Sequence, residues 1–185
     1  IATCPTTALA GTLVVASCQG SMRQFITNAV NVAGANSMRF VPTVAANQTT
    51  FWRVTLAAVL PTLTGADITI DGTAFSNVNG STEINTNDVL LGDTTTKVGR
   101  ITNALPGLNG PELEIRGLDT NIFTVSANNV VVQDIGFHYA AITTTNATNV
   151  VFDRVLFGTI ANSFTDPGAY RSSYGVYISP GTNGL

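Results

Sequence analysis

The feature that most constrains this chain is a strand pattern that recurs at a spacing of about 20 residues. Residues 129–137 match residues 149–157: in each, Asn precedes an alternating apolar pair, two polar residues follow, and a second alternating apolar pair comes next. Residues 67–75 carry the same template, and residues 112–118 carry its first half. A repeat of this length, made of strands and their turns, predicts a solenoid.

Each repeat supplies apolar side chains that alternate along a strand and so face one side. The first pairs are Ile68 with Ile70, Leu113 with Ile115, Val130 with Val132, and Val150 with Phe152. The second pairs, such as Ile135 with Phe137, predict that the chain turns a corner and faces inward again. Neighbouring coils would then bury one continuous apolar column, which favours an all-β parallel β-helix over a sandwich joined by tight hairpins.

One segment has helical periodicity. Residues 21–34 place apolar side chains at helical spacing: Met22, Phe25, Ile26, Ala29, Val30 and Ala33. Ser21 with Gln24 forms a capping-box pattern, and Gly34 is a natural stop. We therefore expect an N-terminal strand and amphipathic capping helix in residues 1–35, followed by β-helix rungs in residues 36–185 as one continuous domain.

Composition limits the partners. Charged residues make up 10% of the chain, the hydrophobic fraction is 44%, and the net charge is −3 with Lys97 as the single lysine. This composition argues against disorder and against nucleic acid as a partner. No stretch approaches the length of a transmembrane helix. Thr and Asn take the place of charge on the predicted exterior, and they suit strands and turns.

Both cysteines lie near the start of the chain. A disulfide between Cys4 and Cys18 would contribute about 3 kcal/mol in the chain-entropy model and would indicate an oxidising compartment. Two buried free thiols are the alternative. Their spacing does not match a zinc motif, and His138 is the single histidine.

Several motifs resemble one known family. Residues 20–26 read GSMRQFI, residues 34–40 read GANSMRF, residues 60–64 read LPTLT and residues 68–72 read ITIDG. Together they resemble secreted bacterial surface proteins and adhesins of the right-handed parallel β-helix, pectate-lyase-like fold. The resemblance covers about residues 12–75. It implies a right-handed coil with an N-terminal capping helix and a secreted, extracellular or cell-surface location, and it implies no activity.

A catalytic constellation is not evident. The repeats align Asp71, Arg116, Gln133 and Asp153 in one outward column. We interpret this polar column as pairs that fix strand register, with a carbohydrate-processing site as the alternative, because Arg and Gln separate the carboxylates that a retaining glycosidase needs close together. His138 has no triad partners in the sequence, so we expect it to be exposed or locally bonded.

No cofactor is predicted. Oxygen ligands gather at Asn85, Asn87, Asp88 and Asp93, but without EF-hand spacing, which leaves calcium as an option only. An enzyme with its site in the connection 77–111 remains the alternative function.

The last segment, residues 174–181, has strand character and no second capping helix. A solenoid needs covered ends, so either a longer chain or a second copy is expected there. The candidate assembly strands include Leu9, Leu13 and Val15 near the start and Val176 and Ile178 near the end. For the strand near the start, we favour the alternative that it forms the first rung of its own coil. The sequence therefore predicts an extracellular structural or adhesive β-helix that self-assembles head-to-tail into a filament, with polysaccharide binding or cleavage as the alternative. Glycans or cell-surface ligands are the other partners considered.

Overall fold

The computed structural model describes residues 20–91, 107–163 and 165–181. Strands dominate, and there is one short α-helix, which confirms the all-β prediction at this level. The elements are α1 (Met22–Ala29), β1 (Asn36–Phe40), β2 (Trp52–Thr55), β3 (Ile68–Phe75), β4 (Glu83–Ile84), β5 (Leu90–Leu91), β6 (Leu108–Asn109), β7 (Leu113–Val125), β8 (Val130–Gln133), β9 (Ile135–Thr144), β10 (Val150–Asp153), β11 (Leu156–Phe157), the 3-10 helix η1 (Gly168–Tyr170) and β12 (Val176–Ile178).

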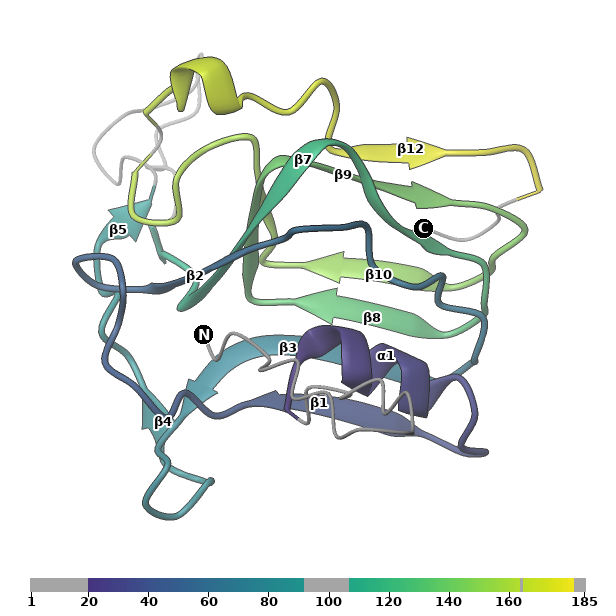
Figure 1. Ribbon diagram of the computed structural model, residues 1–185, viewed down its shortest axis with the longest axis horizontal. Coiled ribbons are helices and arrows are strands. Elements are labelled where there is room, and N and C mark those ends of the chain that lie inside the picture. The colour runs from purple at the N-terminus through teal and green to yellow at the C-terminus, as the bar shows by residue number, and fades with distance from the viewer. Residues whose placement is uncertain (1–19, 92–106, 164, 182–185) are drawn as a thin grey trace, which may run out of the picture.

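Two parallel sheets form the body of the molecule (Figure 1). The first sheet has the order β1-β3-β8-β10, with β4 antiparallel to β3. The second sheet has the order β2-β7-β9-β11, and β12 also pairs with β9. The chain passes from one sheet to the other at β1 to β2, β2 to β3, β7 to β8, β8 to β9, β9 to β10 and β10 to β11. In both orders, β1-β3-β8-β10 and β2-β7-β9-β11, neighbouring strands therefore follow the order of the chain.

The core lies between the two sheets. In the first sheet Ile70 is level with Val132, and Val132 is level with Phe152; Ile70 and Val132 are fully buried. In the second sheet Ile115 is level with Phe137, whose ring stacks on Phe157 with 5.4 Å between centroids. The predicted inward alternation and the corner between the two apolar pairs of a repeat are confirmed at β8 and β9.

Polar residues make the corner directly before three strands of the first sheet, β3, β8 and β10. Asp67, Asn129 and Asn149 have φ values of 58°, 56° and 55°. Asn and Asp enter this left-handed region more readily than other side chains with a Cβ. The amide nitrogen of Asn129 donates to Oδ1 of Asp67 (2.8 Å), and that of Asn149 donates to Oδ1 of Asn129 (2.9 Å). We call these three residues the corner ladder.

The predicted capping helix is present but shorter than expected. Oγ of Ser21 accepts from the backbone N–H of Gln24 at 3.1 Å, which confirms half of the capping box. The other half is wrong, because the Gln24 side chain donates to Asn28 instead. The helix ends at Ala29 with Val30 as its C-cap, before Gly34, which has a φ of 94°.

The helix packs its apolar face on the core. Ile26 and Ala29 are buried, while Phe25 and Val30 pack against the core at partial exposure. Of the two helices that the structure describes, neither has the length and apolar character needed to cross a membrane.

Candidate functional site

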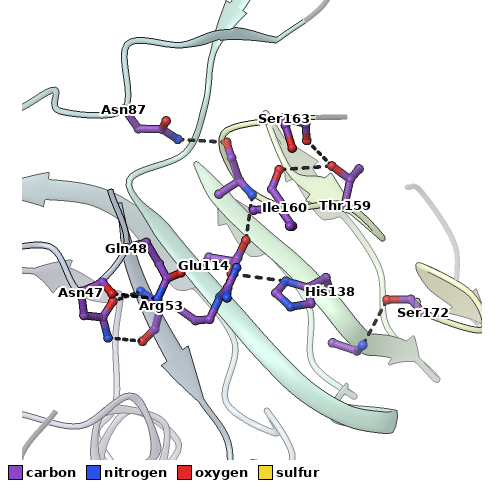
Figure 2. A network of polar contacts seen from close by, with 12 residues as sticks. Asn47, Gln48, Arg53, Asn87, Glu114, His138, Thr159, Ile160, Ser163 and Ser172 are labelled. Carbon is purple, nitrogen blue, oxygen red and sulfur yellow. Dashed lines mark hydrogen bonds and ion pairs between the residues drawn. The ribbon is translucent and has the colours of Figure 1, made fainter. Parts of the chain in front are cut away.

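A buried carboxylate stands on the outer face of the second sheet. Leu113 and Ile115 of β7 face the core, so Glu114 between them points outward. Glu114 is nevertheless fully buried. Its Oε1 pairs with Nε of Arg53 on β2 and lies 3.3 Å from Nδ1 of His138 on β9, and its Oε2 accepts from the backbone N–H of Ala161 at 2.7 Å (Figure 2).

The electrostatics of Glu114 follow from these neighbours. Burial raises the pKa of Glu114, but its contacts with His138 and Arg53 and the hydrogen bond from the Ala161 backbone outweigh it and hold the pKa below its usual value. Glu114 is therefore a carboxylate, and it stabilises the positive charge of Arg53 beneath the segment that contains Ala161.

A second carboxylate lies at the start of the same strand. Glu112 accepts from the hydroxyl of Thr86 and from the backbone N–H of Asn87, both at 2.7 Å. The Asn87 amide donates to the carbonyls of Pro111 and Ala161, at 2.8 and 2.9 Å. Burial raises the pKa of Glu112, and the hydrogen bonds from Asn87 and Thr86 oppose that rise only in part.

The two carboxylates hold surface segments onto the sheet. Glu112 binds the segment at residues 86–87, and Glu114 binds the segment at Ala161. His138 is 2% exposed, so the expectation that it could be exposed is wrong, and the alternative of local bonding fits its place beside Glu114. Because Glu114 and His138 are both closed to solvent, this pair does not present a reactive group to a substrate.

A pocket of about 370 Å³ lies nearby and opens to solvent. It is lined by Thr73, Glu83, Ile84, Asn85, Leu108, Asn109, Gly110, Pro111, Glu112, Asp134 and Arg154. Arg154 donates to both carboxylate oxygens of Asp134, each at 2.6 Å. The pocket thus combines Glu112, whose pKa is raised by burial, with the ionised pair Asp134–Arg154.

The predicted polar column is present in part. Asp71, Gln133 and Asp153 are level on β3, β8 and β10, and the Gln133 amide donates to Asp71 at 3.0 Å. The placement of Arg116 in this column is wrong. Residues 112–118 belong largely to β7 of the second sheet, where Arg116 is level with His138 and its guanidinium lies 3.6 Å from the Tyr170 ring centroid. An alternating apolar pair fits either half of the repeat, so the sequence pattern did not distinguish the two sheets.

The remaining predicted residues lie in several places. Asn87 is buried and uses its side chain in the network above, where its Oδ1 accepts from Thr50. No cluster of three metal-binding side chains occurs in the described part of the chain. Val176 and Ile178 pair with β9 at the edge of the second sheet. Cys4, Cys18, Leu9, Leu13, Val15 and Asp93 lie outside the described residues, so the disulfide and the N-terminal assembly strand stay predictions.

Sequence reasoning missed the roles of Arg53, Glu112 and Glu114. Glu112 and Glu114 flank Leu113 in a strand, and alternation alone would place Glu114 in water. Its burial depends on a segment 47 positions away in sequence, which supplies the N–H of Ala161. One available signal was that Glu114 is flanked by apolar residues in a chain with only 11 acidic residues.

Comparison with known proteins gives no relative: no protein family, curated protein or solved structure matches the chain.

Proposed function

We propose that this chain is a right-handed parallel β-helix that serves as an extracellular structural or adhesive element. The alternation of successive strands between two sheets supports the coil, because each new strand lies beside its predecessor in the same sheet. Parallel strands joined by a crossover connection are almost always right-handed, which supports the handedness.

The observation that supports the structural role is that apolar side chains stay exposed at the end of the molecule formed by β10 and β12. Ile178 is level with Thr144, which is fully buried, yet Ile178 itself is 53% exposed. At the opposite end α1 covers the core through Ile26 and Ala29. A sheet edge with exposed apolar side chains promotes pairing with another chain, so this end is the proposed assembly surface for head-to-tail contact between copies.

The low charge of the chain supports the same role. Only 10% of the residues are charged, which leaves little electrostatic repulsion between copies. Secretion and display on a cell surface follow from the resemblance to secreted β-helix proteins and form part of the proposal.

Electron microscopy and sedimentation of the purified protein test this role. We expect filaments or oligomers that dissociate when Ile178→Asp places a charge on the exposed edge. Asp166→Asn, a change at an exposed residue in the segment before η1, is the matched control and should assemble normally. Monodisperse particles at all concentrations would contradict self-assembly.

One observation favours a second function, polysaccharide binding or cleavage. Glu112, whose pKa is raised by burial, lines the same pocket as Asp134, which pairs with Arg154. A carboxyl group with a raised pKa near a second carboxyl group is the kind of pair that glycoside hydrolysis uses. A screen for products released from polysaccharides, repeated with Glu112→Gln, tests this function. Release that persists in the variant would assign the activity to another site.

A further inference from the structure

The corner ladder has a direction. The side-chain amide of Asn129 donates to Asp67, and that of Asn149 donates to Asn129. Each Asn thus donates to the ladder residue before it in sequence, and each Oδ1 is available to the ladder residue after it. Asn149 is the last member, and among the described residues no donor reaches its Oδ1. The side of the ladder beyond β10 thus presents an acceptor in a fixed position.

The backbone at this edge has a matching direction. The N–H of Asn129 donates to the carbonyl of Thr148 at 3.0 Å. The backbone groups of Asn129 therefore face β10, and so do those of Val131, two residues further on. In a parallel ladder alternate residues face opposite neighbours. With Val131 level with Val151, the N–H of Val151 therefore points away from β8. In the described part of the chain β10 is the last strand of its sheet, and Val151 is 41% exposed.

The apolar side chains at this end continue the core pattern. Ile70 and Val132 are fully buried, whereas Phe152 at the same level of β10 is only half-buried. One further strand with apolar residues at the same positions would bury Phe152 as the neighbouring strands β3 and β10 bury Val132.

We propose that the exposed edge of β10 binds an extended segment of another polypeptide chain as an added parallel strand. The segment carries Asn at the ladder position, to donate to Oδ1 of Asn149, and apolar residues at the first and third positions after it, to cover the open core. This is the chemistry by which β10 itself joins β8, so the contact continues an interface already present in the fold. The inference rests on the proposed structural role and names the partner of that surface.

A fluorescent peptide with the sequence of residues 129–137 is the probe, and its anisotropy is measured against the full-length protein. We expect saturable binding that Val151→Pro weakens at least tenfold, because Pro removes the outward N–H without removing a bond to β8. Val151→Thr keeps the N–H and should bind like the parent. A peptide in which Asn129 is replaced by Ala should bind more weakly.

Circular dichroism first establishes that Val151→Pro is folded. If it is not, Asn149→Gly replaces it, since Gly tolerates the φ of 55° while removing the acceptor. Absence of saturable binding, or equal binding by the parent and the edge variant, would overturn the inference. Filaments that persist without peptide binding would refute this partner and leave the structural role standing.

Discussion

Replacement of Glu114 by Gln should destabilise the fold through the buried ion pair. Gln keeps the shape and an oxygen for the Ala161 N–H but leaves Arg53 without its counter-charge. Removing one partner of a buried pair costs about 3–5 kcal/mol. Because the Arg53 side chain is 19% exposed and retains some hydration, we expect a loss of about 3 kcal/mol, at the lower end of that range.

Urea unfolding followed by circular dichroism measures this loss. The midpoint should fall while the slope stays constant, and the melting temperature should fall by about 6–12 °C for a chain of this size. Glu83→Gln on β4 is the matched control, because Glu83 is exposed. Its unfolding free energy should change by less than about 0.5 kcal/mol.

The pH dependence gives a second check on the same residue. The pKa of Glu114 in the folded protein lies below its ordinary value of 4.5. Its contribution to stability is therefore present above that value and is lost as the pH falls through the lowered folded pKa. The difference in unfolding free energy between the parent and Glu114→Gln should shrink between pH 6 and about pH 3. A constant difference, or a variant as stable as Glu83→Gln, would refute the role given to this carboxylate.

Two further changes test the core and the sheet spacing. Phe137→Ala should lower the unfolding free energy by about 3–5 kcal/mol, because the ring is fully buried and stacked; Val78→Ala, at an 89% exposed side chain, should leave it unchanged in the same urea titration. Gly72→Ala should cost about 1–3 kcal/mol, because a Cβ there would overlap the carbonyl oxygen of Asp134, the corner residue between β8 and β9. Gly136→Ala is its control, since the nearest atoms are side-chain atoms at 3.4 Å. Equal melting temperatures for the two glycine variants would contradict this account of strand spacing.

The sequence predicted those parts of the fold that depend on local periodicity. The alternation around Val130 and Val132, the corner after them and the cap at Ser21 were all visible in it. The assignment of residues 112–118 to a sheet was not, because Leu113 and Ile115 satisfy the inward pattern of either sheet. Only the pairing with β2 and β9 decides it.

The candidate site was less predictable because it depends on tertiary cover. Glu114 and His138 occupy outward strand positions, and whether such positions meet water depends on segments distant in sequence. Asn87 illustrates the same limit. Its neighbours suggested oxygen ligands for calcium, whereas its side chain is engaged by Thr50, Pro111 and Ala161.

The segments on the outer face of the second sheet are attached through their backbone. Glu112 and Glu114 bind the backbone N–H groups of Asn87 and Ala161, and every residue except proline supplies such a group. The hydrogen bond to Ala161 is therefore independent of the side chain at that position. Exposed residues elsewhere in these segments can therefore change while the two glutamates keep the segments in place.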